Sequence, residues 1–390
     1  MSESNVEPPA SEPASAPPEF IFPPPGAALN DNRTAIAPLS TPALPPVIAE
    51  PALESHAFLF HGNEREYFRI WIVNTLLTLL TGGVFAAWAK VRKRRYFRGS
   101  TELLGHRFDY RADPWRILIG NIIVAILFVA YAVVGEVYMP VRVAAFGIAV
   151  LLLPWIVVRA LAFNAHNTTY RGLRFYFRST YAVAAYTYLV QFLLVVLSLG
   201  LLYPRWMRNR REFVVGNHRL GSAYFHFTAP AGTFYVAYIV GGAMIFGAAI
   251  LGGFITTALQ ASSGNKVAAL TDLLPFVLIY ATMFFISKHY IYARLFNHVW
   301  NHTRLDDHRF RANLAVGGWL KLQLKNLVAI IGTAGLFYPF AAIRSARYAL
   351  DSLQLVPVGK PIETIERLGR QEGSAIGETA GEFIGLDLGL

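Results

Sequence analysis

The chain of 390 residues contains no cysteine, which excludes disulfide bonds, iron–sulfur clusters and thiolate zinc sites. Charged residues are also scarce, at 15% of the chain, whereas 54% of the residues are hydrophobic and the mean hydropathy is +0.40. A soluble chain of this composition would have to hide an implausible amount of apolar surface. The composition therefore predicts an integral membrane protein.

The two ends of the chain differ from its middle. Residues 1–55 contain 13 of the 22 prolines and seven acids but a single base, Arg33. This bias predicts a disordered, acidic, Pro/Ala-rich tail, which lacks the basic start and apolar run of a secretory signal. Residues 356–390, rich in glycine and acids, are expected to form a second flexible tail.

Seven apolar stretches lie between the tails, each close to the roughly 20 residues needed to cross a bilayer core of about 30 Å. They are residues 69–89, 117–138, 141–163, 182–204, 234–259, 269–292 and 318–341. The stretches lack the alternation of barrel strands, and lipid offers no partner to an open sheet edge, so helices are expected. The predicted fold is an all-α polytopic membrane protein of about seven helices, with short strands at the membrane surface left open.

An internal repeat organises these stretches. A shift of 117 residues places Phe58 on Phe175 and Gly83 on Gly200, and a further 135 residues places Gly335 in the same position. Units this long suit duplicated membrane modules rather than a solenoid. The predicted membrane units are residues 56–163, 164–293 and, as a partial third copy, 294–355.

Stretches 69–89, 182–204 and 318–341, here called the a segments, share an amide, an apolar run, a glycine and then an aromatic residue or proline. An interhelical hydrogen bond or a substrate contact would each explain the recurring amides, which are Asn74, Gln191 and Asn326. Glycine and proline loosen a helix, so a kink or break is expected in each a segment. The candidate positions are Gly82, Gly83, Gly200, Pro204, Gly335 and Pro339.

Basic residues gather where the a segments end. Residues 56–355 contain 31 Lys and Arg against 11 Asp and Glu. The cluster that follows the first a segment consists of Lys90, Arg92, Lys93, Arg94, Arg95 and Arg98. Such a cluster keeps its loop in the cytoplasm and attracts anionic lipid headgroups at about 1 kcal/mol per base. The predicted partners are therefore the lipid bilayer and its anionic headgroups, with a homo-oligomer left open and no nucleic acid expected.

The charge pattern leaves two topologies open. If all seven stretches span, the second unit is inverted and the bases of Arg205–Arg219 face the periplasm, against the positive-inside rule. If each a segment enters and returns at its glycine, both of its ends stay inside. Pairs such as Phe58/Phe60 and Phe108/Tyr110, which flank the first a segment, would share one face of short strands and favour the second topology. We nevertheless predict seven spans, because uncharged stretches of about 20 residues usually cross.

Several motifs, in order along residues 56–355, resemble the YjgN-like family of bacterial inner-membrane proteins, a domain of unknown function. They are Phe60–Asn63, Trp88–Arg92, Tyr170–Phe175, Asn301–Leu305 and Gly335–Pro339. The resemblance implies a multi-pass protein of the bacterial inner (cytoplasmic) membrane, and it supplies no activity, cofactor or site residue. The chain departs from the pattern through its long tails and through Ala87, which replaces the proline of its other two copies.

Few residues suggest chemistry. Glu136 is the only acid well inside an apolar stretch, where a proton or cation site competes with a side chain that reaches the interface. His298 and His302, four residues apart, could share a metal on a helix, but an interfacial polar turn fits them better. No nucleophile, phosphate-binding loop or paired carboxylate is evident, so neither a catalytic residue, a metal nor a cofactor is predicted, and an enzyme is not expected.

Two function classes remain. Duplicated units, glycine-broken segments and recurring polar residues resemble carriers that build a site at a repeat interface, which favours a transporter or channel with an unknown solute. The scarcity of intramembrane acids favours the alternative, a structural or lipid-organising membrane protein without transport.

Overall fold

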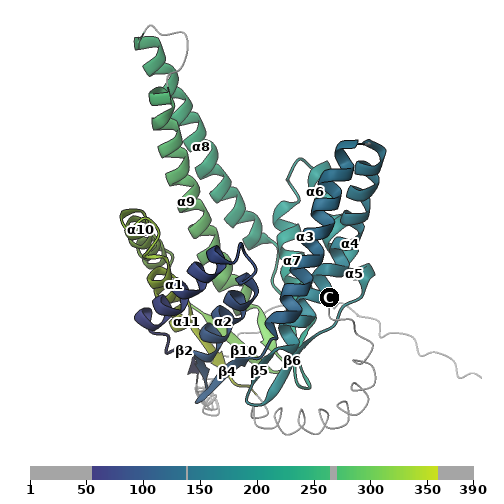
Figure 1. Cartoon of the computed structure of the whole chain (residues 1–390). Coiled ribbons are helices and arrows are strands. Elements are labelled where there is room, and N and C mark those ends of the chain that lie inside the picture. Colours follow the sequence, from purple (N-terminus) through teal and green to yellow (C-terminus); the bar gives the residue numbers. More distant parts are fainter. Residues whose placement is uncertain (1–54, 138, 264–269, 359–390) are drawn as a thin grey trace, which may run out of the picture. The chain divides into compact units, whose positions relative to one another are not determined.

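A computed structural model describes residues 55–137, 139–263 and 270–358, which all belong to one compact unit (Figure 1). The two predicted tails lie outside these residues, except for residue 55 and residues 356–358. The described residues form a single antiparallel sheet of short strands and a set of helices that connect them.

The sheet has eleven strands within the described residues, in the order β1-β11-β10-β9-β8-β7-β6-β5-β4-β3-β2. The strands are β1 (His56–Ala57), β2 (Leu59–Phe60), β3 (Thr101–Leu103), β4 (His106–Tyr110), β5 (Thr168–Tyr170), β6 (Leu173–Phe177), β7 (His218–Leu220), β8 (Ala223–Phe227), β9 (Thr303–Leu305), β10 (His308–Ala312) and β11 (Leu353–Val356). With the exception of β1, which pairs with β11, every strand pairs with the strand that precedes or follows it in the chain, so the sheet is an extended meander.

Helices replace every second turn of this meander. Three connections are short hairpins. The first pairs α1 (Glu64–Leu80) with α2 (Ala86–Gly99), and the third pairs α10 (Val316–Gly332) with α11 (Tyr338–Asp351). In the second, the outgoing arm consists of α5 (Tyr181–Ala185), the π-helix η1 (Tyr186–Val190) and α6 (Gln191–Leu197), and the returning arm is α7 (Tyr203–Gly216). Two are long hairpins: α3 (Pro114–Val137) with α4 (Met139–His166), and α8 (Gly232–Ser263) with α9 (Leu270–Asn301).

All five helical connections leave the sheet on the same side, where the even-numbered strands end and the odd-numbered strands β3 to β11 begin. Each joins an even-numbered strand to the next odd-numbered strand, and those two strands pair antiparallel. Since antiparallel neighbours exchange ends, the exit and the return lie side by side. The opposite ends of the strands are joined by tight turns, such as Leu104-Gly105 between β3 and β4, where both residues have positive φ.

The sheet curves around a row of five phenylalanines, which in spatial order are Phe108, Phe175, Phe225, Phe310 and Phe58. Successive ring centroids in this row are 6.3–6.5 Å apart, although another strand separates each pair. Strands two apart in a flat sheet are about 9.5 Å from each other, so the rings converge on a concave face. Buried leucines and alanines from the strands complete this core.

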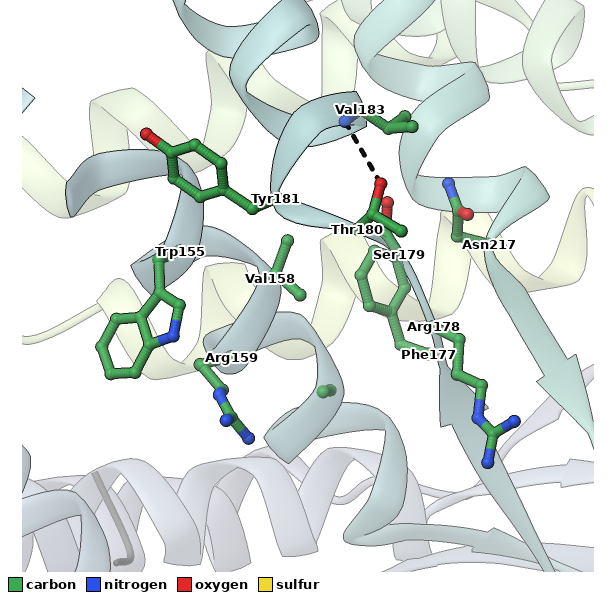
Figure 2. Close-up of a pocket in the computed structure, with 11 residues that line it drawn as sticks. Trp155, Val158, Arg159, Phe177, Arg178, Ser179, Thr180, Tyr181, Val183 and Asn217 are labelled. Carbon is green, nitrogen blue, oxygen red and sulfur yellow. Dashed lines mark hydrogen bonds between the residues drawn. The ribbon is translucent and has the colours of Figure 1, made fainter. Parts of the chain in front are cut away.

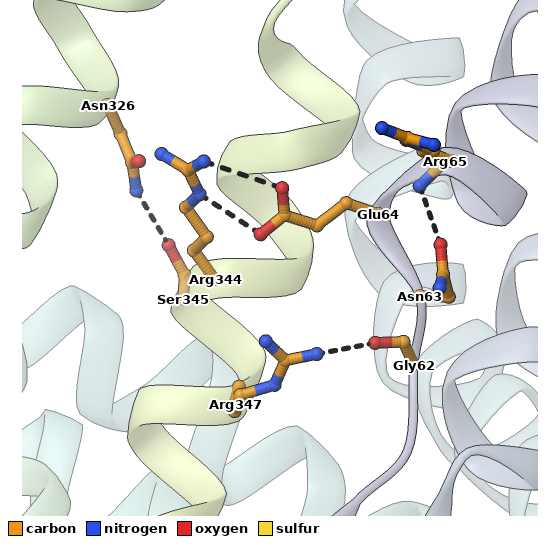
Figure 3. A network of polar contacts seen from close by, with 8 residues as sticks. All are labelled: Gly62, Asn63, Glu64, Arg65, Asn326, Arg344, Ser345 and Arg347. Atoms are coloured by element: carbon orange, nitrogen blue, oxygen red, sulfur yellow. Dashed lines mark hydrogen bonds and ion pairs between the residues drawn. The ribbon is translucent and has the colours of Figure 1, made fainter.

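The two ends of the sheet meet within five residues, because β1 and β2 are separated only by Phe58. Contacts between α1 and α11 hold this junction together (Figure 3). The Arg344 guanidinium donates to both carboxylate oxygens of Glu64, at 3.1 and 3.4 Å, and Arg347 Nη2 donates to Gly62 O at 2.7 Å. The first and last parts of the described chain therefore pack against each other and nearly close the sheet.

The all-α prediction is wrong, because a nearly closed eleven-stranded sheet supports the helices. The number of spans is wrong as well. In the part of the chain that the structure describes, four helices are long and apolar enough to cross a membrane: Pro114–Val133, Met139–His166, Gly232–Ser262 and Leu273–Asn301. They belong to the long hairpins, whereas each a segment turns back partway and returns to the sheet as the second arm of a short hairpin.

Small residues explain how the second long hairpin packs. A Cβ on Gly241 would meet Ile291 Cδ1 at 2.5 Å, and one on Gly252 would meet Phe276 at 2.9 Å. The Ser287 hydroxyl also donates to Gly241 O at 2.9 Å. These glycines therefore serve contact between α8 and α9 inside one chain, as in other close membrane helix pairs.

Candidate functional site

The tip of the first short hairpin is a tight turn. Gly83 adopts φ +97° directly after Gly82 at φ +57°, and Gly83 N–H donates to Thr78 O at 2.8 Å. The Thr81 hydroxyl accepts a hydrogen bond from Phe85 N at 3.0 Å. Consecutive residues with positive φ reverse the chain, and the hydroxyl satisfies a backbone donor that the end of the helix leaves free.

The other two tips have the same geometry. The tip glycine has φ +88° or +92° and donates to the carbonyl five residues earlier at 2.8 Å. The residue two positions before the glycine carries a hydroxyl, which accepts a hydrogen bond from the backbone N–H two positions after the glycine. The glycine and hydroxyl residues are Gly200 with Ser198, and Gly335 with Thr333. Pro204 and Pro339 lie in the first turn of α7 and α11, where a missing N–H costs no hydrogen bond.

The tips expose large apolar side chains. Leu79 is 80% exposed, Leu199 is 94% exposed and Ile331 is 71% exposed. Scattered apolar residues are ordinary on a protein surface, but the same concentration at three separate tips is not. A tip of this kind is suited to hydrocarbon rather than to water.

The amides of the first two a segments bond to the returning arm of their own hairpins. Asn74 Oδ1 accepts from Arg92 Nη1 at 3.4 Å, and Gln191 Oε1 accepts from Asn209 Nδ2 at 3.1 Å. In both cases the donor lies 18 residues after the amide. Of the two roles expected for these amides, the structure supports a hydrogen bond between helices.

The third amide is less well satisfied. Asn326 Nδ2 donates to Ser345 Oγ at 3.3 Å (Figure 3). The same oxygen also accepts from Gln323 Nε2 at 2.9 Å. Asn326 is buried, and its Oδ1 has no hydrogen-bond partner among the described residues. A buried carbonyl without a donor costs about 1–3 kcal/mol, so this hairpin tolerates a local defect.

Half of the basic cluster on α2 packs against strand β4. Arg94 Nη1 donates to the Tyr110 hydroxyl at 2.9 Å and also to Asn164 Oδ1. Arg95 Nε donates to Tyr110 O at 3.2 Å, and the Arg98 guanidinium lies 4.4 Å from the centroid of the Tyr110 ring. Such contacts fix α2 to the sheet and the long hairpin.

The other members of the cluster differ in their contacts. Arg92 bonds Asn74, as described above, and Lys93 Nζ donates to the Tyr338 hydroxyl at 3.3 Å. Lys90 makes no hydrogen bond or ion pair with the described residues. Burial, followed by the nearby Arg94 charge, lowers the pKa of Lys90 below its usual range. Lys90 is exposed and therefore presents a charge without a counterion among the described residues.

Lys90 lines a cavity of about 1550 Å³ between α2, the strands β4 to β6 and the first long hairpin. Bases dominate its polar part: Lys90, Arg94, Arg107, Arg111, Arg116, Arg159, Arg171 and Arg174. Two acids share the lining, Asp109 and Asp113. Asp109 accepts from Arg111 Nε at 2.6 Å, which lowers the pKa of this carboxyl. The excess of positive charge therefore remains after internal pairing.

The other wall of the cavity is apolar and belongs to the long hairpin. It is formed by Ile117, Ile123, Val124, Leu152, Trp155 and Ile156. Val124, Leu152 and Ile156 are among the exposed apolar side chains of these helices. The cavity thus joins a cationic chamber next to the sheet with an apolar surface of membrane-length helices.

A smaller pocket of about 650 Å³ lies beside it, between α4 and the start of the second short hairpin (Figure 2). Trp155 and Arg159 line both spaces, and the Arg159 guanidinium lies 5.6 Å from the Trp155 ring centroid. Figure 2 also shows Thr180, whose hydroxyl accepts from Val183 N at 3.4 Å and caps α5.

The remaining candidates from the sequence lie elsewhere. Glu136 is in α3, at residues whose side chains the structure does not describe. His298 Nε2 contacts Pro230 O at 3.0 Å, and His302 Nδ1 contacts His298 O at 2.8 Å. No group of three or more His, Cys, Asp or Glu that could bind a metal is found within residues 55–137, 139–263 and 270–358.

Sequence reasoning missed the cavity, although it named two of its bases, Lys90 and Arg94. The other six lie on β4, α3, α4, β6, the loop between β4 and α3 and the turn between β5 and β6. They approach one another only because β4 pairs with β5 and β5 with β6. An excess of arginine in residues 107–174 was visible, but not its convergence on one chamber.

The eleven-stranded sheet carries its membrane-length helices on one side, an arrangement suited to a protein that inserts into a bilayer. The chain belongs to the family described as "Bacterial protein of unknown function (DUF898)", whose family model matches residues 55–383. It is 25% identical over 376 residues to "Inner membrane protein YjgN" of Salmonella typhimurium strain LT2, covering 81% of this chain and 95% of that protein.

A protein of the same name from Escherichia coli O157:H7 is 28% identical over 156 residues, which is 40% of this chain and 39% of that relative. The resemblance to the YjgN-like family is thus confirmed, and the relatives are named as inner-membrane proteins without an activity. No solved structure matches this chain.

Proposed function

We propose that this protein is a multi-pass protein of the bacterial inner membrane that binds and organises lipids of the cytoplasmic leaflet. In this arrangement the sheet and the basic arms of the short hairpins lie on the cytoplasmic side. The long hairpins cross to the other side and return, and the short hairpins enter only the inner leaflet. The names of the relatives and the four membrane-length helices support the location.

One observation carries the proposal: three short hairpins with exposed apolar tips leave the same sheet edge as the two long hairpins. Helices α2, α7 and α11 have 14 residues each, about 21 Å, which is too short to cross a core of about 30 Å. The long helices have 24 to 32 residues, or about 36–48 Å. Because short and long hairpins start from the same side of the sheet, they reach two different depths in the bilayer.

This arrangement also removes the charge conflict of the seven-span topology. The bases of α2 and α7 both follow a tip and precede a strand, so they lie near the sheet in both units. The positive-inside rule is then obeyed by both copies. Each tip displaces acyl chains from one leaflet only, while the nearby bases attract anionic headgroups, which together supports a lipid-organising role.

The absence of cysteine allows a direct test of sidedness. Single cysteines replace Ser222 in the β7–β8 turn, Ser352 before β11 and Ser262 at the far end of α8. An impermeant thiol reagent on intact cells should label the Ser262 position alone, and permeabilised cells should add the other two. Labelling of the Ser222 position in intact cells would contradict the proposed arrangement.

A nitroxide at a Leu199→Cys tip tests insertion into the leaflet. In vesicles that contain phosphatidylglycerol, oxygen should quench the label more strongly than a water-soluble nickel chelate does. A label at Ser222 should show the reverse order. A Leu199 label as accessible to the chelate as the Ser222 label would remove the basis for a leaflet-inserting role.

A transporter or channel with a path at the repeat interface is the other candidate from the sequence. It requires the recurring amides to face a path, but the structure provides hydrogen-bond partners for them inside the hairpins. Phenylalanines also fill the concave face of the sheet. Replacement of Asn74, Gln191 and Asn326 by leucine should therefore leave the flux of any candidate solute unchanged in folded protein; loss of flux would favour transport.

A further inference from the structure

We infer that the 1550 Å³ cavity beside α2 is a binding site for one anionic phospholipid, with its phosphate near Lys90 and Arg116 and an acyl chain along α3 and α4. This inference rests on the proposed membrane function and specifies a ligand for it. The site lies between α2, the first long hairpin and strands β4 to β6, and its residues lie outside the recurring a segments.

The charge of the chamber indicates an anionic ligand. Eight Lys and Arg residues line the cavity against two acids, and Asp109 is already paired with Arg111. Neither Lys90 nor Arg116 makes a hydrogen bond or ion pair with the described residues. An ammonium and a guanidinium without counterions are suited to a phosphate, which can accept hydrogen bonds from both.

The order of residues along the helices indicates an amphiphile rather than a soluble anion. Arg116 is the third residue of α3, and Arg159 lies seven residues before the end of α4, about 10 Å from the sheet. The apolar lining starts with Ile117 beside Arg116, and deeper in, with Val124 about 15 Å and Leu152 about 21 Å from the same helix ends, no Lys or Arg of these helices lines the cavity. Polarity therefore falls with depth, as it does from headgroup to acyl chain.

Size and access favour a membrane lipid as the occupant. Pockets for drug-sized molecules have about 300–1,000 Å³, so this cavity is larger than a small anion needs. Val124, Leu152 and Ile156 line the cavity and remain exposed on membrane-length helices, which lets an acyl chain pass from the bilayer into the site. Trp155 lies one turn deeper than Arg159 along α4, and its amphipathic ring is suited to the boundary between headgroup and acyl chain.

The second unit provides a matched control. A shift of 117 residues places Arg94 on Arg211, which is exposed on α7, whereas Lys90 falls on Met207 and Arg116 on Thr233. The two bases without counterions therefore have no counterpart in the second unit. Replacement of Arg211 removes one base from the membrane surface but leaves the cavity intact.

The test measures retention of fluorescent phosphatidylglycerol by detergent-solubilised full-length protein, with phosphatidylcholine as the neutral lipid. The variants are Lys90→Gln, Arg116→Gln, their combination and Arg211→Gln. A charge near the surface contributes roughly a fivefold change per base, so the combined variant should bind about thirtyfold more weakly. Arg211→Gln should bind as the unchanged protein does, and inorganic phosphate at millimolar concentration should not displace the lipid.

Unchanged affinity in the combined variant, or an equal loss in Arg211→Gln, would overturn the inference. Displacement by inorganic phosphate alone would also overturn it, because the site would then recognise a free anion. A photoreactive residue at Val124 gives an independent measurement: in nanodiscs it should crosslink to phosphatidylglycerol more strongly than one at Val236, an exposed residue of α8 outside the cavity that meets bulk lipid only. Binding in detergent does not depend on sidedness, so a failed lipid site and a failed membrane topology give different results.

Discussion

The tip of the second short hairpin allows a prediction in which backbone conformation alone sets the outcome. Gly200 has φ +88°, and a Cβ added there would meet no atom within 4 Å. Gly216, at the end of α7, also has free space for a Cβ, but its φ is not positive. Replacement of each glycine by alanine therefore adds the same methyl group without a clash.

The two substitutions should have opposite effects. An L-residue in the left-handed region costs about 1–2 kcal/mol, so Gly200→Ala should destabilise the hairpin by roughly that amount. Alanine exceeds glycine in helix propensity by up to about 1 kcal/mol, so Gly216→Ala should have no cost or should stabilise α7 by a few tenths of a kcal/mol. Gly83→Ala and Gly335→Ala should resemble Gly200→Ala, because φ is +97° and +92° at those tips.

Two measurements check this pair. Unfolding in a fixed detergent gives the sign of each change, and hydrogen exchange of Gly200 N–H, which donates to Val195 O at 2.8 Å, reports local opening of the tip. A cost of 1–2 kcal/mol corresponds to roughly 5- to 30-fold faster exchange in Gly200→Ala. Equal shifts in Gly200→Ala and Gly216→Ala would refute the assignment of the cost to backbone conformation. Gly200→Asn, which tolerates positive φ, should fall between them.

Three further predictions concern the closure of the sheet, a buried histidine and the long hairpin. Glu64→Gln and Arg344→Gln should each cost little, and a double-mutant cycle should give a coupling below about 1 kcal/mol, because both groups are partly solvated; a coupling of several kcal/mol would contradict this. Burial lowers the pKa of His308, so the unfolded chain binds a proton more readily. Stability should therefore fall as the pH decreases through about 6.5, and thermal unfolding should show a smaller decrease in His308→Gln; an identical decrease would assign the effect to other groups. Gly241→Val should reduce thermal stability by about 1–3 kcal/mol, because its side chain would collide with Ile291, and an unchanged midpoint would show that α8 and α9 can separate at no cost.

The sequence predicted the apolar character of the chain and the recurring tips better than the path of the backbone. Hydropathy was sufficient for the long helices, because 24 to 32 residues can only span or lie buried. It was misleading for the a segments, since an apolar run that reverses at Gly83 has nearly the same composition as one that continues. The aromatic pairs Phe58/Phe60 and Phe108/Tyr110 were the better indication, because Phe60, Phe108 and Tyr110 lie in strands and Phe58 lies directly between β1 and β2.

The strands themselves were hard to predict because they are two to five residues long and owe their stability to neighbours in the sheet. A segment such as His218–Leu220 has too few residues for an alternating pattern to stand out. The cationic cavity was hidden for a related reason. Its bases are spread from Lys90 to Arg174, and only the register of β4, β5 and β6 brings them together.

The near closure of the sheet has a consequence for the order of assembly. His56 pairs with Leu355, and Phe58 N–H donates to Leu353 O at 3.1 Å, across almost 300 residues of chain. During synthesis, β1 therefore lacks its partner until the helices between β2 and β11 have been made and β11 leaves the ribosome. Until then the backbone groups at both sheet edges are free to pair with the wrong partner. Pairing of β1 with β11 is thus the step that completes the sheet.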